Sequence, residues 1–167
     1  MKNQLTVQDI EAMQKEIDYR KLEVRPKALE DVKETRAQGD LSENFEYHAA
    51  KKFKNQNDSR IRYLEKMIKT AEVIQDTTPS DEVSVNKTVT IYIPEDKEEE
   101  IYTIVTTVRE DSLKGLISVE SPLGRALMHH KAGDKVTIFV NKDYSYVAEI
   151  RKIEDAGQAA DVGLRSF

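Results

Sequence analysis

Three carboxylates follow a lone glycine in the stretch RAQGDLSENFEYHAAKK, which runs from Arg36 to Lys52. They are Asp40, Glu43 and Glu46. Asp40 and Glu43 are three residues apart, and on a helix this spacing puts two side chains about 5–6 Å apart on one face. Two such carboxylates can share a hard cation such as Mg²⁺ but cannot fill its octahedron. The remaining ligands would come from water, a substrate phosphate or a partner's carboxylates.

The same residues also fit a helix cap. Asp40-Leu41-Ser42-Glu43 has the spacing of a capping box, in which Asp40 accepts hydrogen bonds from the first N–H groups of a new helix and Glu43 reaches back to another donor. From this stretch alone capping is the favoured interpretation, because such boxes are common at helix starts. The two interpretations differ chemically: a cap tolerates Asp40→Asn with a small loss, whereas a metal ligand needs the charge.

Basic residues follow the acids. Residues 51–69 hold 7 Lys and Arg against 2 Asp and Glu. A solvated helix face is the plain interpretation of such a run, but its position directly behind an acidic segment suggests contact with a polyanion. Residues 1–75 hold 15 basic and 14 acidic side chains, while residues 76–167 hold 11 and 17. The negative charge of the chain therefore lies mainly in its second part.

Helical sequence flanks the acids on both sides. Ile10, Met13 and Ile17 follow three-four spacing, which predicts a helix from about residue 6. Pro26 should kink this helix because proline lacks an N–H and clashes with the preceding turn. Gly39 should end it, as a glycine near a helix end commonly does.

A second helix follows with two adjacent seams, the first apolar near its base and polar near the turn. The first seam consists of Tyr47, Ala50, Lys54, Asn57, Ile61, Leu64, Ile68 and Ala71, and the second of Ala49, Phe53, Gln56, Arg60, Tyr63, Met67, Thr70 and Ile74. Two long helices joined by a short turn pack antiparallel. We therefore predict an antiparallel coiled-coil hairpin over residues 1–76, about 45 Å long, with an acidic tip at residues 39–44.

The pattern changes to period two after a polar linker at residues 77–81. Strands are predicted at residues 88–93, 100–108, 115–119, 135–140 and 146–153, with a short helix over residues 122–130 that begins at a proline. These elements predict a small antiparallel β domain with one short helix over residues 82–155. Residues 156–167 have no period and are predicted to be disordered. The predicted fold class is α+β.

Composition excludes several kinds of site. The 167 residues include no cysteine, so disulfides and thiolate metal sites are excluded. The first residues contain no continuous apolar run, and no stretch reaches the length of a membrane span. We expect a cytoplasmic protein with neither a membrane nor a small molecule as its partner.

The stretch GDLSENFEYHAAK resembles the tip signature of the GreA/GreB family of bacterial transcript-cleavage factors, in its GreA type. VRP at residues 24–26, RIRYLEKMIKTAEVI at 60–74 and LISVESPLGRAL at 116–127 extend the resemblance, which covers about residues 5–155. It implies a helical hairpin followed by an FKBP-like domain. It also implies a factor that inserts its hairpin into the secondary channel of RNA polymerase and stimulates Mg²⁺-dependent cleavage of backtracked RNA. The polymerase's own active site would catalyse that cleavage, so the chain would not itself be an enzyme.

The resemblance implies the acidic site. Asp40 and Glu43 match the family's catalytic acids and would hold a Mg²⁺ ion shared with the polymerase, which is not expected in the free protein. Ser42 matches a variable position. Phe45 departs from the family pattern, because an aromatic side chain stands beside the acids where a small residue is usual.

The resemblance also implies a contact with the 3′ segment of the nascent RNA. Arg36 and Lys51 match the family's basic patch, to which Lys52 and Lys54 could add. Direct attraction between these side chains and RNA phosphates would depend on salt.

A polymerase-docking side is implied in the second domain. Ser121, Pro122 and Arg125 lie in the matching run, although a proline-started helix in a small fold explains the same residues. His129 and His130 depart from the family pattern, and neighbouring histidines without acidic or cysteine partners indicate a surface or packing role rather than a metal site.

Three rival functions remain open at this stage. One is a channel-binding regulator that inhibits the polymerase without stimulating cleavage. Another is a prolyl isomerase, but fold is poor evidence of activity and the chain has no tryptophan. The third is a coiled-coil scaffold, which would not depend on the charge of the tip.

Overall fold

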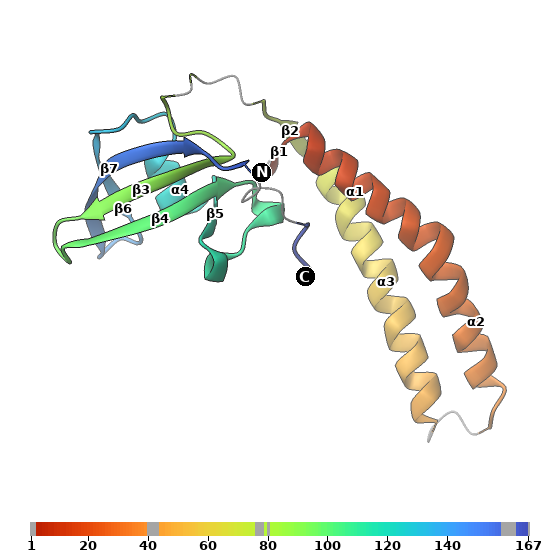
Figure 1. The fold of residues 1–167 in the computed structure, drawn as a ribbon. Helices are drawn as coiled ribbons and strands as arrows, with labels where there is room; N and C mark the ends of the chain where they lie inside the picture. Colours follow the sequence, from red (N-terminus) through yellow and green to blue (C-terminus); the bar gives the residue numbers. More distant parts are fainter. Residues whose placement is uncertain (1–2, 40–43, 76–78, 80, 158–162, 167) are drawn as a thin grey trace. The chain divides into compact units, whose positions relative to one another are not determined.

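The computed structural model describes residues 3–39, 44–75, 79, 81–157 and 163–166. Contacts within the chain divide it into two units, one built mainly from residues 7–72 and the other mainly from residues 73–166. The first unit is a helical hairpin and the second is a small domain around a β-sheet (Figure 1). The predicted α+β fold class is therefore confirmed.

Four helical segments build the hairpin. Helix α1 (Val7–Tyr19) continues through the π-helical segment η1 (Arg20–Val24) into α2 (Arg25–Arg36), and α3 (Phe45–Lys69) returns beside this arm (Figure 1). The short strands β1 (Asn3–Leu5), before α1, and β2 (Ala71–Val73), after α3, pair with each other. The predicted seams of α3 extended past residue 70, and β2 replaces their last part.

The proline changes the first arm without ending it. In η1 the N–H of Arg25 donates to the carbonyl of Arg20, five residues earlier, which is the π-type pattern. Pro26 has no N–H with which to bond the preceding turn, and the irregular segment lies directly before it. The predicted end of the arm before Gly39 is confirmed, because α2 ends at Arg36 and Gly39 has φ 131°.

Polar partners fix the direction of the two arms. Nε of Arg60 lies 2.7 Å from Oε2 of Glu16, and Nη1 of Arg20 donates to Oδ1 of Asn57 at 2.9 Å. The amide of Asn57 also donates to the carbonyl of Arg20 at 3.3 Å. Later residues of the first arm thus meet earlier residues of the second, so the arms are antiparallel as predicted.

Apolar packing concentrates in the part of the hairpin away from the turn. The buried apolar side chains of this unit are Met13, Ile17, Ala28, Ile61, Leu64 and Met67. Nearer the turn Asn57 is buried, so the predicted change from an apolar to a polar seam is confirmed at this residue.

The second predicted seam is wrong near the turn. Arg60 and Met67 are buried, but the members closest to the turn are exposed, namely Ala49, Phe53 and Gln56. The reason is geometric. A single antiparallel helix covers only a narrow stripe of its partner, so the neighbouring stripe of α3 faces water.

A five-stranded sheet forms the second unit, with strand order β5-β4-β3-β7-β6. The strands are β3 (Lys87–Ile93), β4 (Glu98–Val105), β5 (Leu116–Ser118), β6 (Lys135–Phe139) and β7 (Ser145–Asp155). Neighbours are antiparallel except β4 and β5, which are parallel. The predicted strand over residues 100–108 ends early because the chain turns through the 3₁₀ helices η2 (Thr107–Arg109) and η3 (Ser112–Lys114), and this crossover reverses the expected direction of β5.

Alternation along the strands builds the core of this domain. β3 buries Val89, Ile91 and Ile93, as period two requires for one face of a sheet. Helix α4 (Pro122–Leu127) adds Leu127 to the same core. The helix is shorter than predicted, and His129, beyond its end, has φ 68°, a left-handed conformation that does not continue a helix.

The end of the chain has contacts where disorder was expected. Among the described residues 163–166, the N–H of Arg165 donates to the carbonyl of Val108 at 2.8 Å, and its guanidinium lies 3.3 Å from Glu110. Arg165 therefore has two contacts with the segment around η2, while disorder over residues 156–167 stays a prediction. Sequence period cannot reveal a segment that is held by a backbone hydrogen bond and one ion pair.

Glu16 ties the two arms together electrostatically. It accepts hydrogen bonds from Arg60 at 2.7 and 3.2 Å and from Arg20 at 2.9 Å. Burial raises the pKa of Glu16, but the hydrogen bonds from Arg60 and Arg20 outweigh this and leave the pKa below its usual 4.5. Because the folded pKa is depressed, the charged form stabilises the hairpin above pH 4.5, and this contribution is lost as the pH falls through the folded pKa.

We therefore expect the helical signal of the protein to melt at lower temperature as the pH falls below about 4.5, and Glu16→Gln to reduce this dependence. At pH 7 the same substitution should destabilise the hairpin by about 1.5–3 kcal/mol, the usual size for a hydrogen bond to a charged group. Thermal melts followed by circular dichroism between pH 3 and 7 measure both effects. Glu65→Gln is the matched control, because Glu65 pairs with Lys21 on the exposed surface. An unchanged pH profile in Glu16→Gln would contradict this role.

Candidate functional site

Asn44 joins the two helices at the turn of the hairpin. It has an extended backbone (φ −88°, ψ 91°), and its Oδ1 accepts a hydrogen bond from the N–H of Tyr47 at 2.9 Å, so it is the N-cap of α3. Its Nδ2 donates to the carbonyl of Thr35 at 2.7 Å. The first N–H and last C=O groups of a helix lack partners within that helix. One amide side chain therefore satisfies the end of α2 and the start of α3 together.

The capping interpretation of the acidic stretch is wrong for α3. That interpretation makes Asp40 the N-cap, but α3 begins at Phe45 and Asn44 caps it. Asn44 prevails because its side chain offers both an acceptor for α3 and a donor for α2, which a carboxylate lacks. Asp40, Ser42 and Glu43 themselves lie outside the described residues. The start of α3 thus does not need them as caps.

The described residues next to this stretch carry exposed side chains. Glu46, in the first turn of α3, is exposed, and acid at this position favours the helix dipole. Phe45 is 85% exposed. Among the described residues, no group of three acidic, histidine or cysteine side chains is arranged to hold a metal ion.

The predicted basic residues fall into two groups. Arg36, Lys51 and Lys52 are exposed, the first in the last turn of α2 and the others in the second turn of α3. Lys54 is half-buried and pairs with Asp58 at 3.4 Å, which also accepts from Arg25 at 3.2 Å. Lys54 therefore contributes to the hairpin itself, and the exposed three are the ones available to a polyanion.

Ser121 serves the local fold of the predicted docking run. Its Oγ caps α4 by accepting from the N–H of Gly124 at 3.0 Å, and it donates to the carbonyl of Ser118 at 2.7 Å. A Cβ at Gly124 would stand 2.1 Å from that same carbonyl oxygen, so only glycine fits here. Pro122 and Arg125 are exposed on the outside of the helix. A docking contact would therefore fall to these two side chains.

The two histidines after α4 lie at the surface. His130 Nδ1 lies 3.2 Å from Asp134, which also accepts from the N–H of Lys131 at 2.9 Å. The hydrogen bonds from Lys131 and His130 hold the pKa of Asp134 below its usual value. These contacts close the turn before β6.

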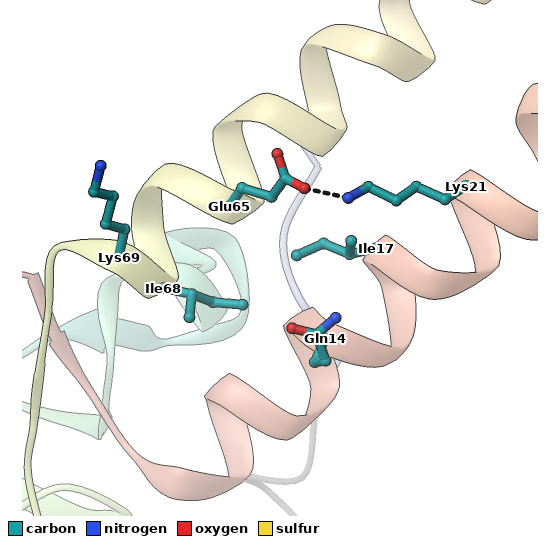
Figure 2. A pocket seen from close by; sticks show the side chains of 6 residues that line it. All are labelled: Gln14, Ile17, Lys21, Glu65, Ile68 and Lys69. Carbon is teal, nitrogen blue, oxygen red and sulfur yellow. Dashed lines mark hydrogen bonds and ion pairs between the residues drawn. The ribbon is translucent and has the colours of Figure 1, made fainter.

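A hollow lies between the first arm (α1 and η1) and α3, in the half of the hairpin away from the turn. Its lining is Gln14, Ile17, Lys21, Glu65, Ile68 and Lys69, and the Lys21–Glu65 ion pair crosses from one helix to the other (Figure 2). At about 190 Å³ it is smaller than the 300–1,000 Å³ usual for a ligand pocket. Its size is that of a gap in the packing of two helices.

The sequence interpretation missed Asn44 as the residue that organises the turn. The signal for it is an N-cap residue type directly before Phe45, the first residue of α3. The capping-box spacing of residues 40–43 is a competing signal and favours Asp40 as the cap. No helix within the described part of the chain is long and apolar enough to cross a membrane.

Comparisons with known proteins agree in both units. Residues 3–73 match the family model described as transcription elongation factor, N-terminal, and residues 78–155 match transcription elongation factor, GreA/GreB, C-term. The chain is 40% identical over 151 residues to transcription elongation factor GreA of Streptococcus sanguinis, covering 90% of this chain and 94% of that protein. It is 41% identical over the same coverage to GreA of Streptococcus pneumoniae serotype 19F.

Solved structures also match along most of the chain. GreA factor homolog 1 of Thermus thermophilus is 20% identical with a TM-score of 0.44, covering 92% of this chain and 99% of that one. GreA/GreB from Nitrosomonas europaea is 25% identical with a TM-score of 0.40, covering 56% of this chain and 78% of that one.

We expect Asn44→Ala to destabilise the hairpin by about 1–2 kcal/mol, because it removes the cap of α3 and the donor to Thr35. Asn44→Asp should cost less, since it keeps the cap acceptor and loses only the donor. Melts followed by circular dichroism measure both. Asn55→Ala is the matched control, on the exposed surface of α3. Equal stability of Asn44→Ala and this control would show that the bridge does not hold the turn.

Proposed function

The chain belongs to the GreA/GreB family of transcription elongation factors, and we propose that it is a transcript-cleavage factor of bacterial RNA polymerase, acting in the cytoplasm. Its hairpin enters the secondary channel of the polymerase and brings Asp40 and Glu43 to the active centre. There it stimulates hydrolysis of backtracked nascent RNA and so rescues arrested complexes. The polymerase performs the catalysis.

The observation that supports this proposal most is the capping of α3 by Asn44. Side chains that cap a helix serve its stability and are not available to a partner. Because Asn44 takes this role, the carboxylates of Asp40 and Glu43 are not required at the start of α3. Capping of α3 therefore does not account for the two acids between the arms of the hairpin.

The acids act together with groups of the polymerase. Asp40 and Glu43 contribute carboxylate oxygens, the ligands that Mg²⁺ prefers, and two of them leave room for ligands from the polymerase. A Mg²⁺ ion held by Asp40 and Glu43 together with groups of the polymerase would supply positive charge against the phosphate during hydrolysis. Two carboxylates on a turn cannot enclose a substrate or exclude water, so the hairpin needs the polymerase's active centre around it.

The basic side chains hold the RNA. Arg36, Lys51 and Lys52 are exposed near the turn, and each can neutralise one phosphate of the displaced 3′ segment. Pro122 and Arg125, exposed on α4, contact the rim of the channel. These contacts orient the factor and leave the chemistry to the acids.

Asp40→Asn tests the proposal directly. The substitution keeps the size of the side chain and removes its charge, so we expect folding and polymerase binding near those of the wild type and a loss of stimulated cleavage. A stalled, backtracked polymerase complex, incubated with each protein and followed by gel analysis of the transcript, measures this. The matched control is Glu46→Gln, which removes an exposed carboxylate from the first turn of α3.

Each result has a distinct meaning. Cleavage by the wild type and by Glu46→Gln, but not by Asp40→Asn, supports the proposal. Undiminished cleavage by Asp40→Asn would contradict the role given to this residue. Binding of the wild type that slows transcription without any cleavage would favour the inhibitory regulator instead.

A second prediction concerns the basic side chains. Lys51→Glu should raise the factor concentration needed for half-maximal cleavage, most strongly at low salt. At higher salt the Debye length shortens, and screening reduces the difference between the variant and the wild type. Loss of one phosphate contact should reduce the slope of log affinity against log salt by about 0.7. Titrations of the factor between 50 and 300 mM salt measure it. Lys27→Glu is the matched control on α2, away from the turn, and equal effects of the two substitutions would rule out a local RNA contact.

A further inference from the structure

Two phenylalanine rings stand in solvent on the outer face of α3 near the turn. Phe45 is 85% exposed and Phe53 is 53% exposed. Residues 45, 49, 52, 53 and 56 lie on one side of the helix, since positions three, four and seven apart are neighbours on its surface. All five are exposed. We call this set, consisting of Phe45, Ala49, Lys52, Phe53 and Gln56, the aromatic stripe.

The hairpin does not need these rings for its own fold. The buried residues of α3 closest to the turn are Asn57 and Arg60, and the stripe reaches the turn on a face that the first arm leaves uncovered. Phenylalanine has low helix propensity, and the side chain of Phe45, at 85% exposed, buries little apolar surface. Its presence at the first residue of α3 and again eight residues later therefore indicates a role outside the hairpin.

Charge on and beside the stripe indicates the chemistry of the partner. Lys52 lies in the stripe directly before Phe53, and Lys51 and Arg36 are exposed near the same end of the hairpin. Glu46 is the exposed carboxylate of the first turn, but it lies about 100° around the helix from Phe45, as one residue of helix requires. Aromatic faces interleaved with cations are the arrangement by which proteins bind single-stranded nucleic acid, with bases stacked on rings and phosphates near Lys or Arg.

The spacing of the rings also fits a nucleic acid strand better than a protein surface. Phe45 and Phe53 are about 12 Å apart along the helix axis, and between them stand only a methyl group and polar side chains. A stable protein interface of standard size buries about 800 Å² on each partner, and two separated rings supply only a small part of such an area. Stacking needs only one free ring face per base and contributes about 1–3 kcal/mol for each.

We propose that the aromatic stripe stacks unpaired bases of the displaced RNA 3′ segment, with Phe45 and Phe53 as the two platforms and Lys52, next to Phe53, at a phosphate of the same strand. This inference rests on the proposed function, which brings that RNA to the hairpin. It adds a contact with the bases to the phosphate contacts of Arg36 and Lys51. The stripe thus holds the strand beside the acids while cleavage occurs.

The test places 2-aminopurine in the 3′ segment of a backtracked RNA, because stacking on an aromatic ring quenches its fluorescence. The factor carries Asp40→Asn, so that the RNA remains uncleaved during the measurement. Three double variants are compared in this background: Phe45 and Phe53 both changed to Leu, both to Tyr, or both to Ala. Leu keeps apolar surface without a ring face, whereas Tyr keeps the ring. Circular dichroism melts verify that these exposed substitutions leave the hairpin folded.

We expect quenching by the parent and by the Tyr double variant, and at least a fivefold weaker effect with the Leu and Ala double variants. In a background with Asp40 intact, the Leu double variant should raise the factor concentration for half-maximal cleavage by a similar ratio. If Leu behaves as the parent and only Ala weakens binding, the stripe contacts protein and the proposal is overturned. Equal quenching by all four proteins also overturns it.

Failure of the inference is distinct from failure of the proposed function. If the factor with intact Asp40 and phenylalanines stimulates cleavage but no quenching depends on the rings, only the stacking role is wrong. If that factor neither binds the complex nor stimulates cleavage, the proposed function is wrong, and the stacking role is overturned with it.

Discussion

The hydrogen bonds of Asn44 are the constraint on which the turn of the hairpin depends. A helix that ends and another that begins within a few residues leave carbonyls and N–H groups without partners inside either helix. The Asn44 amide donates to the α2 carbonyl of Thr35 and accepts from the α3 N–H of Tyr47. It thereby fixes the distance between the two helix ends and the residue at which α3 begins.

Polar contacts continue along the seam from that point. The Arg20–Asn57 and Glu16–Arg60 pairs stand where a coiled coil would usually place apolar side chains. Buried polar pairs add less stability than apolar packing of the same volume, but they specify register, because a shifted pairing leaves buried charges without partners. The hairpin therefore holds one alignment with few apolar contacts near its turn, and the side chains on its outer faces remain available to a partner.

Much of this arrangement could be predicted from the sequence, and the errors have physical causes. Three-four spacing located both arms, and Gly39 marked the turn. The predicted start of α3 is wrong because Asp40 and Glu43 have capping-box spacing. Asn44, which caps α3, also donates to a carbonyl of α2. A local sequence pattern does not record such a contact between two helices. The second seam was wrong near the turn because periodicity shows which residues share a face but not whether a partner covers that face. The parallel direction of β5 depends on a crossover through two short 3₁₀ helices, which period-two strands do not reveal.

The exposed rings of Phe45 and Phe53 follow from the same geometry. A two-helix hairpin has one covered stripe on each helix, so any further periodic stripe of large side chains must face outward. In a larger bundle another helix would cover such a stripe, and its residues would be core. Here Lys52 lies within it, and the only apolar group of the stripe between the two rings is the methyl group of Ala49. A third helix would have to bury the Lys52 ammonium against the rings, which is costly without a paired charge. A flexible polyanion with planar bases can place phosphates near Lys52 and stack its bases on the two rings. The composition of the stripe therefore favours a nucleic acid over a helix as the partner.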